Sequence, residues 1–99
     1  MVKSFLILAA AFAAAAPAQA AGPHYAAELA QARPAVGTMV VHDIAWRCAG
    51  AGCAAGRSDS RPLTDCMALA RQVGALKSFA VEGTALPPDQ LEKCNAAAH

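Results

Sequence analysis

The sequence predicts a small α+β domain in which disulfide bonds hold together a short antiparallel sheet and two helices. Four cysteines occur in 99 residues, and large apolar side chains are few because alanine supplies much of the hydrophobic fraction. Strand-like and helix-like patterns follow one another in the order β-β-α-β-α, with both helices expected on one face of the sheet. The interior of a mature chain of about 79 residues seldom stabilises a domain alone, so covalent links are expected.

Residues 1–20 have the pattern of a secretory signal peptide. Lys3 provides the positive charge, an apolar run follows it, and Ala18-Gln19-Ala20 is a small-residue cleavage site. We expect cleavage after Ala20, with cleavage after Ala21 as the alternative. The apolar run of about 12 residues is too short to span a bilayer core of ~30 Å, so no membrane span is expected after cleavage. A periplasmic or secreted location follows, and disulfides persist in such compartments.

Residues 21–36 predict a flexible N-terminal tail. Tyr25 and Leu29 could share a helical face, but Pro23 and Pro34 limit the segment to about ten residues, and an isolated helix that short is marginal in water. The domain itself is therefore expected to comprise residues 37–96, and residues 97–99 are expected to fray.

The strongest strand pattern extends from Thr38 to Cys48. Val40, Ile44 and Trp46 fall on one face at a period of two. Trp46, the only tryptophan, is the expected core anchor. Two glycines between Cys48 and Cys53 predict a tight reversal, after which residues 53–56 return as a short partner strand.

Two helices and one further strand complete the domain. Residues 63–73 carry an apolar stripe that includes Cys66, and Gly74 ends that helix. Residues 76–83 predict a strand with Phe79 as a second core anchor, paired with the strand at 38–48. The last helix begins near two prolines and an aspartate. It places Cys94 on its apolar face, and Asn95 is expected to cap its end.

Four cysteines allow three pairings, of which Cys48–Cys53 with Cys66–Cys94 is preferred. The first pair flanks one reversal, and the second lies on the inner faces of the two helices. Cys48–Cys66 with Cys53–Cys94 is the runner-up. A zinc or copper(I) site built from these cysteines with His42 or Met67 is the competing interpretation. The absence of Cys-x-x-Cys and the oxidising compartment argue against it, and no metal or other cofactor is expected.

Function is bounded mainly by exclusion. Without the leader and its Lys3, seven Lys and Arg balance seven Asp and Glu, so no basic patch for nucleic acid can form. Nucleophile-elbow, zinc-protease and phosphate-loop motifs are absent from the sequence. A non-enzymatic protein that binds another protein or an envelope component is expected. The alternatives are a periplasmic metal-binding module that uses Cys and His, and a small hydrolase or enzyme inhibitor. The candidate binding residues are His42, Arg57 and Arg61.

A wider pattern runs through the chain: Trp46-Arg47-Cys48, then Cys53, Ser60-Arg61-Pro62 and Cys66, and finally Cys94-Asn95. This pattern resembles a family of exported alphaproteobacterial proteins of about 100 residues whose function is unknown. The resemblance covers residues 38–95. It implies a bacterial periplasmic setting and carries no activity or site residues to transfer.

Overall fold

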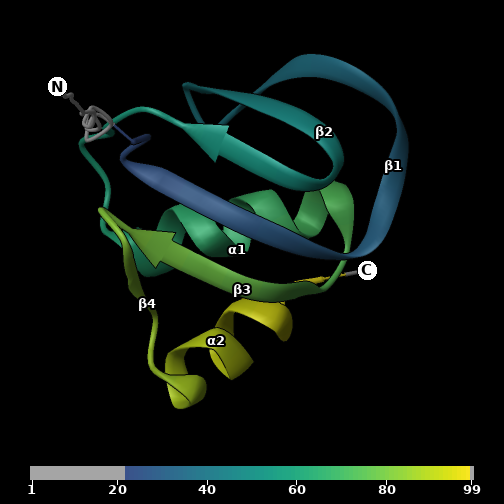
Figure 1. Cartoon of the computed structure of the whole chain (residues 1–99). Helices are drawn as coiled ribbons and strands as arrows, with labels where there is room; N and C mark the ends of the chain where they lie inside the picture. Colours follow the sequence, from purple (N-terminus) through teal and green to yellow (C-terminus); the bar gives the residue numbers. More distant parts are fainter. Residues whose placement is uncertain (1–21, 99) are drawn as a thin grey trace, which may run out of the picture.

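The computed structural model describes residues 22–98 and consists of one four-stranded antiparallel sheet and two helices (Figure 1). The α+β class is confirmed, with one more short strand than expected. The predicted signal peptide at 1–20, both cleavage positions and His99 lie outside the described residues. The sheet order is β2-β1-β3-β4. In chain order the elements are β1 (Tyr25–Val41), β2 (Ile44–Ala55), α1 (Pro62–Val73), β3 (Leu76–Val81), β4 (Thr84–Ala85) and α2 (Pro88–Asn95).

The predicted flexible tail at 21–36 is wrong from Tyr25 onward, because that segment begins β1. Tyr25, Ala27 and Leu29 alternate on the buried face. The same stretch of β1 pairs with β2 on one side and with β3 on the other. Alanine at positions 26, 27 and 30 hides the period of two from the sequence, since alanine satisfies a helical pattern as well as an extended one. Pairing on both sides supplies the stability that the isolated segment lacks.

The expected single strand from Thr38 to Cys48 is interrupted by a turn. His42 (φ 55°) and Asp43 (φ 66°) both adopt the left-handed conformation, and Val41 pairs with Ile44 across them. Positive φ at both central residues defines the two-residue hairpin turn whose twist matches that of paired strands. The alternating pattern continues on both sides of this turn, which is why the sequence reads as one strand.

The predicted reversal between Cys48 and Cys53 lies inside β2. Figure 1 shows β2 doubling back within its own length while β1 curves around it. Gly50 has a φ of 60° in this bend, and the Cys48–Cys53 disulfide closes it with a Cα–Cα distance of 4.0 Å. β3 pairs with residues 25–29 of β1, and the expected pairing of β3 with residues 38–48 is wrong.

α1 begins at Pro62 and ends before Gly74, whose N–H donates to the Ala70 carbonyl at 2.8 Å. α1 packs on β1 and β3, and α2 packs on α1 and β3. Neither helix within residues 22–98 is long and apolar enough to cross a membrane.

Asn95 has a different role from the predicted helix cap. Its side-chain amide accepts from the Leu76 N–H at 2.8 Å and donates to the Leu76 carbonyl at 2.9 Å, so it binds β3 as a neighbouring strand would. The predicted fraying of 97–99 also fails for residues 97 and 98. Their N–H groups donate to the carbonyls of Cys94 and Asn95, and Ala98 packs against the core.

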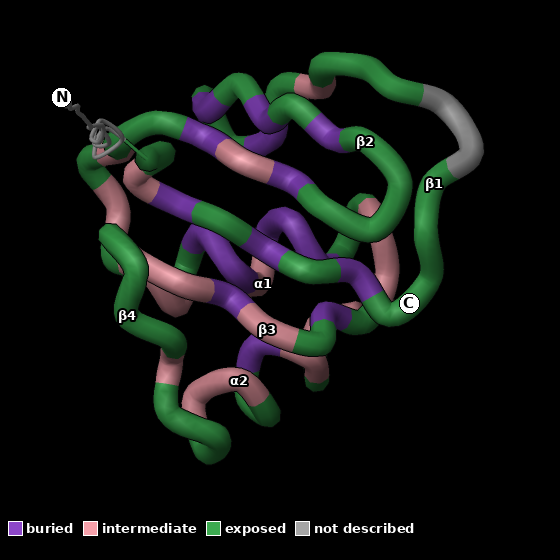
Figure 2. Tube along the Cα trace, viewed as in Figure 1, coloured by how far each residue is buried: buried purple, intermediate pink, exposed green. Residues whose placement is uncertain are grey.

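The core lies between the sheet and the helices, where buried residues alternate along β1 and β2 and cluster on α1 (Figure 2). Trp46 and Phe79, the two expected anchors, are fully buried with ring centroids 5.9 Å apart. Tyr25 completes the aromatic cluster at 5.1 Å from Phe79. The Cys66–Cys94 disulfide joins α1 to α2, so the preferred cysteine pairing is the one that the structure contains.

Candidate functional site

Polar side chains gather at one corner of the domain, where the start of β1, the loop before α1 and the β3–β4 turn meet. Arg57 lines two hollows there. The larger, of about 610 Å³, also contacts His24 and Glu82. The smaller, of about 220 Å³, also contacts His42 and Ser58. We call this region the Arg57 corner and define it by His24, His42, Arg57, Ser58 and Glu82.

Glu82 organises the exposed part of the Arg57 corner. Its backbone, at a φ of 50° in the β3–β4 turn, donates an N–H to the His24 carbonyl at 2.7 Å. Its Oε2 accepts from Arg57 Nη2 at 3.0 Å and lies 3.2 Å from His24 Nδ1. The Arg57 side chain is 74% exposed, and exposed ion pairs contribute only about 0–1 kcal/mol to stability. The pair therefore orients Arg57 more than it stabilises the fold.

A buried hydrogen-bond cluster lies beneath the Arg57 corner. Asp65, in the first turn of α1, is 1% exposed. Its Oδ2 accepts from the Tyr25 hydroxyl at 2.7 Å and from Ser58 Oγ at 2.5 Å. Ser58 Oγ in turn accepts from the Ser60 N–H at 2.9 Å. These bonds tie β1 and the loop before α1 to the helix.

Burial is the main cause that raises the pKa of Tyr25, to about 12, and the hydrogen bond to Asp65 adds to it. Asp65 Oδ1 and Trp46 Nε1 are buried, and neither has a hydrogen-bond partner within the described chain. Unpaired buried polar atoms carry a desolvation penalty, so these two atoms lower the stability of the fold.

The hydrogen bonds of Ser58 bear on the hydrolase alternative. A serine nucleophile needs a general base within hydrogen-bond reach. Over residues 22–98, Ser58 Oγ donates to Asp65 Oδ2 and lies 3.5 Å from the Ser60 carbonyl oxygen, and the His24 ring contacts Glu82 instead. These bonds anchor the loop before α1, and within residues 22–98 no histidine forms a hydrogen bond with the Ser58 hydroxyl.

The structure brings together two of the three candidate binding residues. His42 and Arg57 line the smaller hollow, whereas Arg61 is exposed immediately before α1 and lines neither hollow. Sequence reasoning missed Tyr25, because it placed this residue in the tail. It also missed Asp65 as a buried hydrogen-bond acceptor. Position 65 directly precedes a buried cysteine at the start of a helix, which gave no signal that its carboxylate would be buried.

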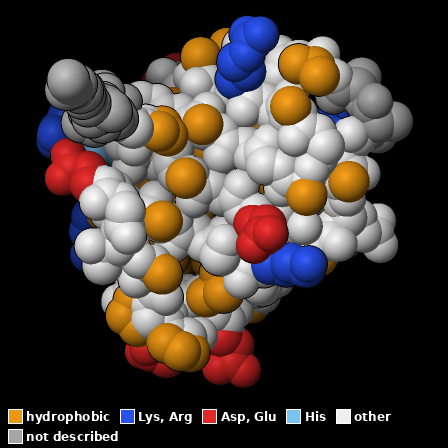
Figure 3. Space-filling model, in the orientation of Figure 1, with side chains coloured by type: hydrophobic (Ala, Val, Ile, Leu, Met, Phe, Trp, Pro, Cys, Tyr) orange, Lys and Arg blue, Asp and Glu red, His pale blue; other side chains and the backbone are white. Residues whose placement is uncertain are grey.

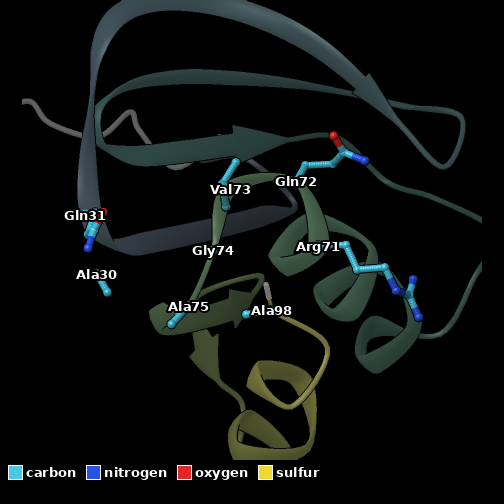
Figure 4. Close-up of a pocket in the computed structure, with 8 residues that line it drawn as sticks. All are labelled: Ala30, Gln31, Arg71, Gln72, Val73, Gly74, Ala75 and Ala98. Atoms are coloured by element: carbon cyan, nitrogen blue, oxygen red, sulfur yellow. The ribbon is translucent and has the colours of Figure 1, made fainter.

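A separate hollow of about 480 Å³ lies at the carboxyl end of α1 (Figure 4). Its lining includes Ala30, Gly74 and Ala75, and the polar ends of Arg71 and Gln72 point away from those residues. Gln31 is the lining residue whose polar side chain lies near Ala30 (Figure 4), so the polar groups of this hollow do not converge on one point.

The cysteines do not form a metal site. All four sulfurs are in disulfides, and a thiolate ligand requires a free cysteine. In the described part of the chain, no three His, Cys, Asp or Glu side chains are grouped as metal ligands. The four cysteines are therefore not available as the ligands that the metal-binding alternative requires.

Together the fold and the corner define a small α+β domain with two disulfides and a polar surface site. The chain belongs to DUF8200, a family of unknown function, whose family model matches residues 9–96. A search of curated proteins and a search of solved structures each found no match.

Proposed function

We propose that this protein is exported to the bacterial periplasm and acts there by binding a protein or an envelope component, without catalysing a reaction. The leader pattern of residues 1–20 supports export. Two disulfides suit an oxidising compartment. The resemblance to exported alphaproteobacterial proteins supports the same setting.

One observation supports the binding role: Arg57 is exposed and lines two neighbouring hollows on a domain held by two disulfides. Glu82 orients its guanidinium through a hydrogen bond of 3.0 Å, and the Arg57 side chain as a whole remains mostly exposed to solvent. An oriented guanidinium suits a carboxylate or phosphate group of a partner, because its donors match such oxygens in pairs. His42 would contact the same partner from the smaller hollow.

Two matched arginines allow a direct test. Arg57→Gln removes the charge at the corner, and Arg61→Gln removes the same charge at an exposed position outside both hollows. The mature wild-type protein and both variants would be immobilised. Each would be exposed separately to periplasmic extract, purified peptidoglycan, and vesicles containing anionic phospholipid. We expect one of these probes to be retained by the wild type and Arg61→Gln, and lost with Arg57→Gln.

The result that contradicts the proposal is equal retention by all three proteins, or retention by none. Assays of ester, amide and phosphoester hydrolysis by the wild type and by a Ser58→Ala variant address the hydrolase alternative. Turnover that disappears in Ser58→Ala would establish an enzyme and overturn the non-catalytic role. Circular dichroism of each variant excludes unfolding as the cause of a loss.

A further inference from the structure

The last part of β1, residues 36–41, is an open edge of the sheet, and we call it the edge limb. On one side, Gly37–Val41 pairs with residues 44–48 of β2. On the other side no strand of the described chain lies next to it, because β3 pairs only with residues 25–29 of β1. The edge limb therefore has backbone groups available for another strand.

The hairpin turn determines which backbone groups these are. A turn at His42–Asp43 joins the Val41 carbonyl to the Ile44 N–H, and in an antiparallel pair hydrogen-bonded residues alternate with non-bonded ones. Val41, Met39 and Gly37 therefore bond to β2, and Thr38 and Val40 direct their N–H and C=O groups outward. Neither of these two residues makes a backbone hydrogen bond to a loop or turn elsewhere in residues 22–98.

The side chains of the edge limb lack the features that normally keep sheet edges apart. Exposed edges are usually protected by charge, proline or very short length. The six residues from 36 to 41, Val-Gly-Thr-Met-Val-Val, include no charge and no proline. Val36 and Val40 are the large hydrophobic residues most exposed in the described chain, at 66% and 73%. The opposite edge of the sheet, by contrast, is the two-residue strand β4.

We propose that the edge limb pairs antiparallel with the edge limb of a second copy of this chain, which makes a two-fold dimer with one continuous sheet. In the register that we infer, Thr38 lies opposite Thr38 of the second copy. Val36 then lies opposite Val40, twice by symmetry. In this register, backbone N–H and C=O groups that point outward from one copy face those that point outward from the other. The exposed valines of the two copies then lie side by side. Cross-strand valine pairs and threonine pairs each stabilise a sheet by about 0.2–1 kcal/mol.

The edge limb carries no charge, which suits the equally uncharged edge limb of a second copy better than a charged peptide. Arg47 pairs with Thr38 inside each copy and therefore lies one strand away from the junction. Three strand spacings would separate the two Arg47 positions in the dimer, roughly 14 Å, which exceeds the screening length of about 10 Å. The mature chain has no formal net charge after loss of Lys3, so two copies do not repel at long range.

The outer face of the main sheet offers no comparable surface. Ala26, Ala54 and Ala80 occupy it in register, and small apolar side chains lie scattered singly across it (Figure 3). The edge limb is distinguished by its unpaired backbone together with its two exposed valines.

Sedimentation equilibrium of the purified mature protein, over a range of concentrations, tests the proposal. Val40→Lys puts a charge on the edge limb. Ala45→Lys is the control. It puts the same charge on β2, at the exposed residue that pairs with Val40 and lies one strand away from the proposed junction. We expect the wild type and Ala45→Lys to form dimers with similar dissociation constants. For Val40→Lys we expect the dissociation constant to rise by about tenfold or more, because like charges at a paired edge repel.

A wild type that stays monomeric up to millimolar concentration, or equal weakening by both lysine substitutions, would overturn the proposal. The register is tested separately by oxidation of Thr38→Cys and Ala45→Cys variants. A covalent dimer that forms through position 38 and not through position 45 supports the inferred register. Efficient linkage through position 45 refutes it. Far-ultraviolet circular dichroism verifies that each variant is folded.

Discussion

Tyr25 makes the stability of this protein sensitive to alkaline pH. Burial raises the pKa of the Tyr25 hydroxyl from 10.0 to about 12. The unfolded chain loses this proton from pH 10 upward, whereas the folded protein retains it until about pH 12. The stability that depends on the protonated Tyr25 hydroxyl is therefore fully present well below pH 10. We expect it to decrease by up to about 1.4 kcal/mol per pH unit between pH 10 and pH 12, toward a total loss of about 2.7 kcal/mol above pH 12.

The chain contains one tyrosine, so a tyrosine ionisation signal can be assigned to Tyr25. Absorbance of the phenolate reports its ionisation, and urea titrations at increasing pH report the free energy of unfolding. The control is Tyr25→Phe, which loses the 2.7 Å hydrogen bond to Asp65. That variant should be less stable at neutral pH and should lack the part of the alkaline decline that belongs to Tyr25. A folded protein whose tyrosine ionises near pH 10, or a Tyr25→Phe variant with an unchanged alkaline slope, would refute this reasoning.

Three further predictions concern the two disulfides, the contact between Asn95 and β3, and export of the protein. Replacing both cysteines of the Cys66–Cys94 bridge by alanine should lower the free energy of unfolding by about 3.5 kcal/mol, against about 2 kcal/mol for the Cys48–Cys53 bridge. The Cys66–Cys94 bridge closes the longer loop, with a sequence separation of 28 against 5, and so restricts the unfolded chain more. Urea titration measures the free energy of unfolding of both variants. Equal losses would contradict the expected difference between the two bridges. Asn95→Ala should cost about 1–3 kcal/mol, since it leaves two backbone groups of β3 without partners. A neutral result in thermal unfolding would disprove that role. Intact mass of the exported protein should equal residues 21–99 less four hydrogens, and a retained leader or free thiols would contradict export with oxidation.

Local chemistry determines the parts of the fold that the sequence predicted well. The α1 helix has proline at its start, an apolar stripe and glycine at its end, and each of these acts within a few residues. The cysteine pairing followed from the position of each cysteine relative to a turn or a helix face. Such features need no knowledge of distant partners.

The parts that failed depend on contacts between residues far apart in the chain. The segment Tyr25–Leu29 becomes a strand because β2 and β3 pair with it on both sides, and alanine gives no local indication of that. Asp65 becomes a buried acceptor because a residue 40 positions earlier reaches it. The Arg57 corner was only half predicted for the same reason. Glu82 and His24 are 58 positions apart, and no sequence motif links them.

The central position of β1 has a consequence for how the polypeptide matures. Its first residues are synthesised before any of their neighbours, and the β3 residues that flank them come about fifty positions later. Until that later stretch is made, Tyr25 and Leu29 have nothing to pack against on that side. A shortened chain that begins at Gly37, which looks harmless from the sequence, would lack the middle of the sheet. The domain can therefore assemble only once nearly all of it is available.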